Sequence, residues 1–174
     1  MISSVERVNK NQKEVLFSKL TSQFGSDLSG KSIAVWGLSF KPDIDDLRES
    51  PAMWITKELA KTHEGKVIAV EPNDSAIISG GEPGPHPIQG IGPGFFPEVF
   101  NTKSIDGAIR ITKEEAFAEV QNLAKMEGIL VGISTGASVA AVRKQLQTVN
   151  PEKTILTINY DTGERYLSIE GLLT

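Results

Sequence analysis

The stretch AIRITKEEAFAEVQNLAKMEGILVGI, residues 108–133, decides the fold of this chain. It opens with AIRI at 108–111, which is predicted to be a strand. Thr112 and Glu115 then have the spacing of a capping box, and the apolar residues after them recur at helical intervals until a glycine ends the pattern. An apolar run follows at 129–133. The stretch therefore predicts a strand, a helix and a second strand in direct succession.

The same alternation continues on both sides of this unit. The further helices and strands are expected at 4–23, 32–36, 51–63, 66–70, 134–149 and 154–160. Strands that alternate with helices favour parallel pairing, with helices on both faces of the sheet. We therefore predict an α/β fold: a three-layer α/β/α sandwich of Rossmann-like type, with a mainly parallel sheet of about five strands. Residues 1–174 are expected to form a single domain.

A long segment rich in glycine and proline, at 71–101, interrupts the alternation and is predicted to be a loop. Loops of this length in a compact domain are usually functional or face a partner. Within it, the region 88–100 carries Phe95, Phe96 and Phe100. We expect this region to mediate self-association, as an exposed apolar surface does.

Composition excludes several classes of function. The 174 residues carry a net charge of −4, which argues against nucleic-acid and anionic-membrane partners. The chain has no cysteine and two histidines, so thiol chemistry is excluded and no metal site is expected. The sequence has no run of about 20 apolar residues and does not begin like a signal peptide. A cytoplasmic location is therefore expected.

The run AVWGLSFKPDIDDLRESPAM, residues 34–53, carries one family resemblance. It resembles the C-terminal, UDP-binding domain of UDP-N-acetylmannosamine and UDP-glucose dehydrogenases, and we assign residues 1–65 to this likeness. The resemblance implies a UDP-binding edge at Phe40, Lys41 and Arg48, with the lysine holding the UDP part of the substrate. The alternative for these residues is a surface lysine and an arginine paired with a nearby aspartate.

Residues 66–174 carry a second resemblance, to the C-terminal part of cysteine synthase (O-acetylserine sulfhydrylase), which uses pyridoxal phosphate. The matching stretches are SGGEPGPHPIQGIG at 79–92, GILVGISTGA at 128–137 and DTGERYLS at 161–168. In that family the first of these stretches lines the mouth of the active site. The third stretch brings a polar side chain toward the pyridine nitrogen of the cofactor. In this chain that residue is Asp161 or Thr162, and the two are left open.

Both families have catalytic parts that this sequence lacks. The dehydrogenases use a Gly-x-Gly-x-x-Gly turn for NAD and a catalytic cysteine, and cysteine synthase uses an earlier lysine and a phosphate-binding loop. The sequence therefore predicts an engineered or recombined chimeric scaffold that is not an enzyme. It would have no catalytic residues and no cofactor, with neither pyridoxal phosphate nor NAD bound productively. The alternatives are a residual binding module for UDP or another phosphate ligand, and a truncated pyridoxal-phosphate-dependent cysteine synthase fragment.

Overall fold

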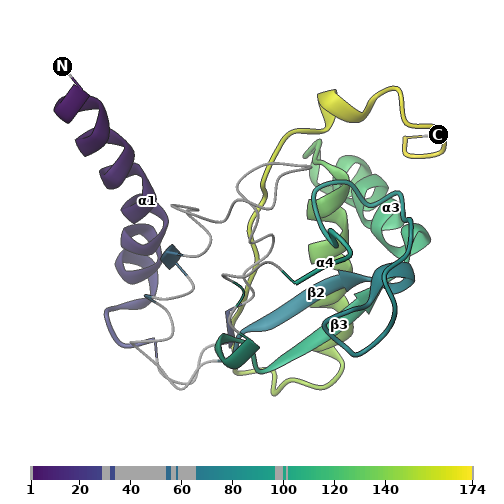
Figure 1. The fold of residues 1–174 in the computed structure, drawn as a ribbon, viewed down its shortest axis with the longest axis horizontal. Coiled ribbons are helices and arrows are strands. Elements are labelled where there is room, and N and C mark those ends of the chain that lie inside the picture. Colours follow the sequence, from purple (N-terminus) through teal and green to yellow (C-terminus); the bar gives the residue numbers. More distant parts are fainter. Residues whose placement is uncertain are drawn as a thin grey trace.

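Two pairs of parallel strands organise the chain in a computed structural model, which describes residues 2–28, 32–33, 54–55, 58, 66–96, 100 and 102–173. In one pair β2 (Ile68–Pro72) runs beside β3 (Gly107–Ile111), and in the other β1 (Ser32–Ile33) runs beside β4 (Ile155–Leu156). Figure 1 shows β2 and β3 in front of α4. The predicted α/β fold with parallel strands is confirmed. The described residues form two two-stranded sheets, so the single sheet of about five strands is not seen.

The strand predicted at 129–133 is wrong. Val131 makes one isolated antiparallel bridge, to Thr162, and no ladder. Helix α4 (Ile133–Leu146) already begins at Ile133, with Gly132 as its N-cap. The apolar run therefore enters a helix whose first residues are buried, and an apolar run of this length is compatible with either structure.

Helix α3 (Lys113–Asn122) begins as predicted. The Thr112 hydroxyl accepts from the N–H of Glu115 at 3.3 Å, and the Glu115 carboxylate accepts from the N–H of Thr112 at 2.9 Å, which completes the capping box. The chain then widens into one π-helical turn, η3 (Leu123–Glu127). Gly128 ends it in the left-handed conformation, with a φ of 67°.

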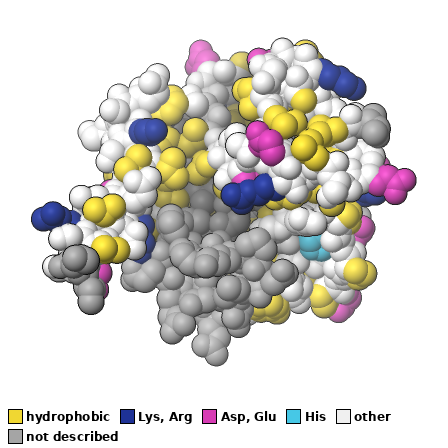
Figure 2. Space-filling view, turned by 90° about the horizontal axis from the view of Figure 1, so that it is seen from above, with side chains coloured by type: hydrophobic (Ala, Val, Ile, Leu, Met, Phe, Trp, Pro, Cys, Tyr) yellow, Lys and Arg dark blue, Asp and Glu magenta, His cyan; other side chains and the backbone are white. Residues whose placement is uncertain are grey.

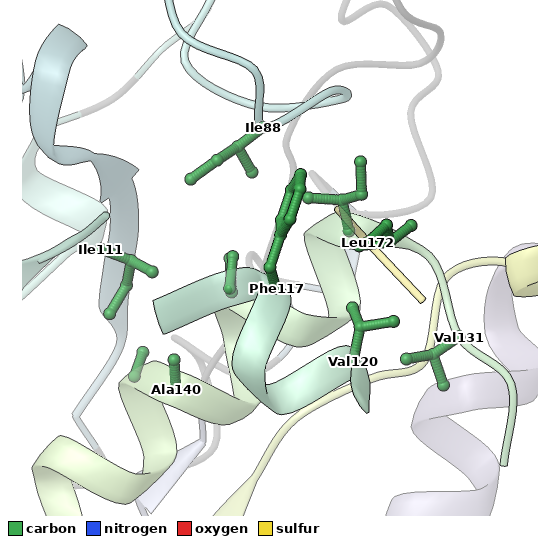
Figure 3. Close-up of a cluster of buried hydrophobic side chains, with 11 residues drawn as sticks. Ile88, Ile111, Phe117, Val120, Val131, Ala140 and Leu172 are labelled. Atoms are coloured by element: carbon green, nitrogen blue, oxygen red, sulfur yellow. The ribbon is translucent and has the colours of Figure 1, made fainter. Parts of the chain in front are cut away.

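The main core lies between α3, α4 and the end of β3. Figure 3 shows side chains from these elements meeting around Phe117, together with Ile88 from the loop and Leu172 from the C-terminal segment. Its buried members are Ile88, Ile111, Ala116, Phe117, Val120, Val131, Ile133, Ala137, Ala140, Ala141 and Leu172. Alanines on α4 permit this close packing because they have little volume to place between the helices.

Gly136 marks the closest approach of the two helices. A Cβ atom at this position would lie 2.3 Å from the carbonyl oxygen of Ala116 and 2.5 Å from Cγ2 of Val120. Both distances are far below van der Waals contact, and one of them is to the backbone of α3. Glycine at this position therefore allows α4 to lie directly against α3.

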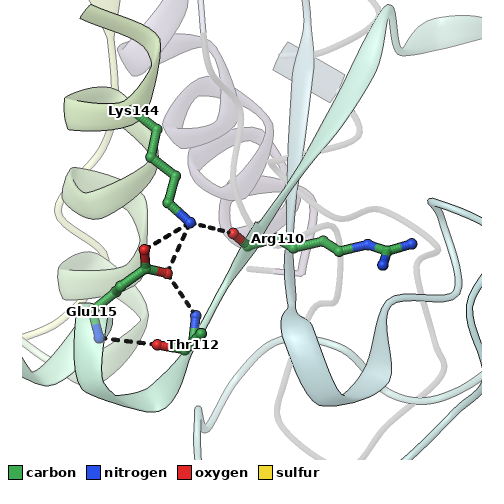
Figure 4. A network of polar contacts seen from close by, with 4 residues as sticks. All are labelled: Arg110, Thr112, Glu115 and Lys144. Carbon is green, nitrogen blue, oxygen red and sulfur yellow. Dashed lines mark hydrogen bonds and ion pairs between the residues drawn. The ribbon is translucent and has the colours of Figure 1, made fainter. Parts of the chain in front are cut away.

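Polar contacts also join α4 to the start of α3 (Figure 4). The Nζ of Lys144 donates to the carbonyl oxygen of Arg110 at 2.8 Å and to the Glu115 carboxylate at 2.9 Å. Burial alone raises the pKa of Glu115, but the hydrogen bonds from Lys144 and from the Thr112 N–H outweigh it and hold this pKa below its usual value. The capping glutamate therefore also serves as an ion-pair partner.

Helix α1 (Ile2–Phe24) confirms the helix predicted at 4–23, and projects away from the remainder of the fold in Figure 1. Its second half packs on Ile55 and Leu156 through Leu20 and Phe17. Seen from above, hydrophobic side chains lie on this helix and on the surface that faces it (Figure 2), where the described residues line a groove of about 730 Å³. None of the described helices is long and apolar enough to cross a membrane.

Candidate functional site

Two chain segments cross at Asp161 and Thr162, the two residues for which the resemblance predicts a cofactor contact. The N–H of Gly132 donates to the carbonyl oxygen of Asp161 at 3.2 Å, and the N–H of Gly163 donates to that of Leu130 at 3.2 Å. Thr162 lies between these two hydrogen bonds, in the antiparallel bridge to Val131. The backbone of Thr162 is therefore held from both sides.

The side chain of Asp161 points into this crossing. Its Oδ2 accepts a hydrogen bond from the Tyr166 hydroxyl at 2.6 Å. Its Oδ1 is buried, has no hydrogen-bond partner among the described residues, and would lie 2.0 Å from a Cβ atom placed on Gly132. Gly132 is the N-cap of α4 and offers no side chain to cap it, so the carboxylate lies where the helix dipole favours a negative charge.

Tyr166 closes the other side of the crossing. Burial raises the pKa of Tyr166 to about 12, with the hydrogen bond to Asp161 and the charge of Asp161 as the next causes. The phenol therefore stays protonated and remains a hydrogen-bond donor throughout the physiological range. Its ring also lies against Gly132, because a Cβ there would be 2.8 Å from Cε2 of Tyr166.

Thr162 points the other way. Its side chain is exposed, unlike that of Asp161. A hydrogen bond with the Thr162 side chain is the main cause that lowers the pKa of Glu164 below its usual value. Of the two residues that the sequence left open, the structure turns Asp161 inward and Thr162 outward.

The first turn of α4 is tied to the same segment. The Thr135 hydroxyl donates to Oδ1 of Asn159 at 3.0 Å and accepts from the N–H of Tyr160 at 3.3 Å. These bonds hold residues 159–160, which lead from β4 to Asp161, against the first turn of α4. The candidate site is thus built from α4 and the segment after β4.

The loop after β2 is organised by a buried carboxylate that the sequence analysis did not identify as a site residue. Glu71 is 2% exposed and accepts from the N–H groups of Ile78 and Ser79 at 2.8 and 3.0 Å, and also from the Ser79 hydroxyl. Arg110, which faces Glu71 in the register of the two strands, donates to the carbonyl oxygen of Ser79 at 3.2 Å. The feature of the sequence that could have identified Glu71 is an acidic residue at the end of an apolar strand.

Further along this loop, His86 Nε2 lies 2.9 Å from the carbonyl oxygen of Gly92, whose φ is 61°. Phe95 and Phe96 are 44% and 52% exposed, and the Phe96 ring lies 5.5 Å from that of Phe100. The loop predicted at 71–101 is confirmed over its described part from residue 73 onward, apart from a 3-10 turn at Asn73–Ser75, whereas Glu71 and Pro72 still belong to β2.

The other predicted site residues cannot be placed against this geometry. Phe40, Lys41 and Arg48, the predicted UDP-binding edge, lie outside the described residues. Over the part of the chain that the structure describes, no group of three or more His, Cys, Asp or Glu side chains could hold a metal ion.

Comparisons with known proteins match one family over most of the chain. The family model described as "Pyridoxal-phosphate dependent enzyme" matches residues 52–161. The chain is similar to cysteine synthase of Staphylococcus aureus (strain Mu50 / ATCC 700699), with 43% identity over 103 residues, which cover 59% of this chain and 33% of the relative. The chain thus spans about a third of the length of this curated relative.

Solved structures agree with this match. A cysteine synthase from Entamoeba histolytica superposes with a TM-score of 0.73 and 31% identity over 90% of this chain and 44% of its own. An O-acetylserine dependent cystathionine beta-synthase from Helicobacter pylori gives a TM-score of 0.73 and 34% identity over 88% of this chain and 46% of its own. An O-ureido-L-serine synthase gives 0.76 and 28% over 92% of this chain and 48% of its own.

These matches overturn four of the predictions from the sequence. The family match begins at residue 52, inside the 1–65 segment assigned to a dehydrogenase, and the solved structures superpose on nearly the whole chain. The chimeric, engineered scaffold is therefore wrong, and the dehydrogenase likeness is not supported. The predictions that the chain is not an enzyme and has no cofactor are also wrong, because the matching family consists of enzymes that use pyridoxal phosphate. The resemblance of 66–174 to cysteine synthase is confirmed.

Proposed function

Because this chain belongs to the family of pyridoxal-phosphate dependent enzymes, we propose that it forms one part of an enzyme of the cysteine synthase type. The observation that carries this proposal is the crossing at Thr162. The Thr162 hydroxyl is exposed on a backbone that hydrogen bonds hold from both sides, in the stretch that the resemblance predicts to lie beside the pyridine ring. Open α/β sheets bind ligands at such edges, beyond the carboxyl ends of their strands.

The residues present fit the pyridine end of the cofactor. The Thr162 hydroxyl donates to the Glu164 carboxylate, so its oxygen could accept from a protonated ring nitrogen, and it would have to release Glu164 to donate to an unprotonated one. Gly132 leaves the space at the crossing free of a side chain, and Asp161 fills that space from within. When bound, pyridoxal phosphate supplies an electron sink for reactions at the α-carbon of an amino acid. The role of this chain would be to orient the ring and shield its edge from water.

The substrate class follows from the proteins that this chain resembles. One of them depends on O-acetylserine, a serine with an activated oxygen at the β-carbon, and another is a synthase that makes O-ureido-L-serine. We therefore propose replacement at the β-carbon of such a serine as the reaction of the enzyme to which this chain contributes. Since the chain spans less than half of these structures, the activity is proposed for the assembled enzyme.

Partners and organisation stay proposals. We propose that the exposed phenylalanines of the loop, Phe95 and Phe96, mediate contact between copies of the chain. The single-domain organisation over 1–174, the absence of nucleic-acid and membrane partners and the cytoplasmic location stay predictions from the sequence.

Calorimetric titration tests the cofactor site directly. The ligand should be pyridoxine phosphate, which keeps the ring and the phosphate but has no aldehyde and so cannot react with surface lysines. We expect saturable binding to the wild type and weaker binding to Thr162→Val, which keeps the shape of the side chain and removes the hydroxyl.

The matched control is Thr148→Val, the same change at an exposed threonine beyond α4, whose hydroxyl donates to the carbonyl oxygen of Gln145. It should bind like the wild type. No saturable heat with the wild type would refute the proposed function. Equal affinity of Thr162→Val and the wild type would remove Thr162 from the site.

A further inference from the structure

We propose that Glu71 is a positioning residue, whose buried carboxylate holds the loop 76–92 in place at the carboxyl end of β2. Open α/β sheets bind ligands beyond the carboxyl ends of their strands, and this loop leaves β2 at that end. The link to a ligand rests on the proposed function, because 79–92 is the stretch for which the resemblance predicts the mouth of the active site. The hydrogen bonds from Ile78 and Ser79 to the Glu71 carboxylate, called the Glu71 latch below, are a property of the fold.

Glu71 is buried although it lies directly before a loop. Its side chain is 2% exposed, and a buried carboxylate is costly unless hydrogen-bond donors replace the water that it loses. Among the described residues, these donors all come from the loop itself. They are the N–H groups of Ile78 and Ser79, at 2.8 and 3.0 Å, and the Ser79 hydroxyl. The carboxylate and the near arm of the loop therefore stabilise each other.

The latch depends on the carboxylate being an acceptor at both oxygens. Oε1 accepts from the N–H and the hydroxyl of Ser79, and Oε2 accepts from the N–H of Ile78. An ionised carboxylate has acceptor sites only, and hydrogen bonds to a charged acceptor are about twice as strong as neutral ones. An amide of the same shape would turn an NH2 group toward at least one of these donors. Glu71→Gln therefore keeps the volume of the side chain and removes part of the latch.

The far arm of the loop is held by the next residue of the strand. A Cβ on Gly92 would lie 2.6 Å from Cγ of Pro72 and 2.9 Å from Nε2 of His86, so Gly92 is enclosed between the two rings. His86 Nε2 donates to the carbonyl oxygen of Gly92 at 2.9 Å. Between the two arms, Ile88 is 1% exposed and packs in the main core. Because the far arm and the middle have these contacts of their own, Glu71 positions the near arm.

A first experiment measures the latch without any ligand. Hydrogen exchange by NMR should be recorded for the amides of residues 78 and 79 in the wild type and in Glu71→Gln, at a temperature where both are folded. Because at least one hydrogen bond to a charged acceptor is lost, we expect exchange at one or both amides to accelerate about tenfold. Unchanged exchange at both amides would overturn the latch.

Glu119→Gln is the matched control. Glu119 is a buried glutamate on α3, and its carboxylate accepts from Arg143 on α4. The same change there should leave the amides of residues 78 and 79 near the wild-type rate. Equal acceleration in Glu119→Gln and Glu71→Gln would show a general loss of stability and would overturn the latch.

Ser79→Ala is a second variant, which decides the question if Glu71→Gln does not fold. Ser79 is exposed, and the change removes only the hydroxyl donor to the carboxylate. We expect exchange at residues 78 and 79 to accelerate by less than in Glu71→Gln. If Ser79→Ala is the only one of the two variants that folds, unchanged exchange in it would overturn the latch.

A second experiment asks whether the latch serves the binding site. Pyridoxine phosphate affinity should be measured by calorimetry for the wild type, Glu71→Gln and Ser79→Ala, with Glu119→Gln as the control. A loosened loop has to be ordered again on binding, so we expect the affinity of the two loop variants to fall at least severalfold. The affinity of Glu119→Gln should stay near that of the wild type. Unchanged affinity in the loop variants would overturn the positioning role.

The latch and the proposed function fail in different ways. If the wild type binds no pyridoxine phosphate while the amides of residues 78 and 79 still respond to Glu71→Gln, the proposed function fails and the latch stands as a feature of the fold. If the wild type binds and Glu71→Gln changes neither exchange nor affinity, the proposed function stands and the role of Glu71 is refuted.

Discussion

Gly136→Ala tests the account of the packing of α4 on α3, because two opposite effects meet at this position. In an exposed helix interior, alanine is more favourable than glycine by about 0.8–1.0 kcal/mol. Here the new Cβ would lie 2.3 Å from a backbone oxygen of α3 and 2.5 Å from a Val120 methyl group. Overpacking of a core costs about 1–3 kcal/mol, and a clash with backbone belongs at the upper end because no rotamer change relieves it.

The clash therefore wins by about 2 kcal/mol, the upper value of about 3 less the gain of about 1. For a domain of 150–250 residues this corresponds to a fall in Tm of roughly 4–8 °C. Urea unfolding followed by circular dichroism should give a lower midpoint with an unchanged slope.

Ala118→Gly is the matched control, since Ala118 lies on the exposed face of α3. It should lose about 1 kcal/mol by propensity alone. The pair should thus show alanine favoured at 118 and disfavoured at 136. If Gly136→Ala left the stability unchanged or raised it, the close approach of the two helices would be refuted.

Four further predictions test the cap, the ion pair, the crossing and the loop. Thr112→Ala should lower the free energy of unfolding by about 1 kcal/mol through loss of the capping box, measured by urea unfolding. The pKa of Glu115 is lowered, so the stability that its ionised carboxylate contributes is present above the usual pKa and is lost as pH falls through the folded pKa. Glu115→Gln should therefore lower the free energy of unfolding at neutral pH and have little effect in acid. A larger loss of stability in acid than at neutral pH would contradict this prediction. Spectrophotometric titration should show the Tyr166 phenol ionising with a pKa near 12, and Asp161→Asn should lower that pKa. Because this pKa is raised in the folded protein, the stability that the protonated phenol contributes is present below pH about 10 and is lost as pH rises through the folded pKa. Light scattering should show mass increasing with concentration, less so in Phe96→Ser; a strict monomer at high concentration would refute self-association.

The sequence predicted best where structure is decided locally. The cap at Thr112, the strand before it and the left-handed Gly128 all follow from residues within one or two turns of each other. The run at 129–133 failed because its apolar residues satisfy a buried strand and a buried helix start equally well. What decides between them is the pairing of Val131 with Thr162, which lies far away in the sequence.

The candidate site was predicted only in part for a similar reason. The resemblance named Asp161 and Thr162, but which one faces outward depends on Gly132 and Tyr166, and no local pattern joins these residues. Glu71 was missed because it lies at the start of the glycine- and proline-rich segment 71–101, which was predicted only as a loop. Its buried carboxylate instead closes the loop that follows β2.

The chimera was inferred from catalytic groups that two families have and this sequence lacks. The packing of α4 against α3 and against Asp161 is stronger evidence about the fold than such missing groups. The crossing and the core share one element: the N–H of Gly136 donates to the carbonyl oxygen of Gly132 at 3.1 Å, so the glycine that meets α3 and the glycine that meets Asp161 lie on the same helical turn. A displacement of α4 at Gly136 must therefore also alter the contact between Gly132 and Asp161. The continuity of this packing from Ala116 through α4 to Tyr166 is what a single family fold requires, because each close contact depends on a small residue at the matching place.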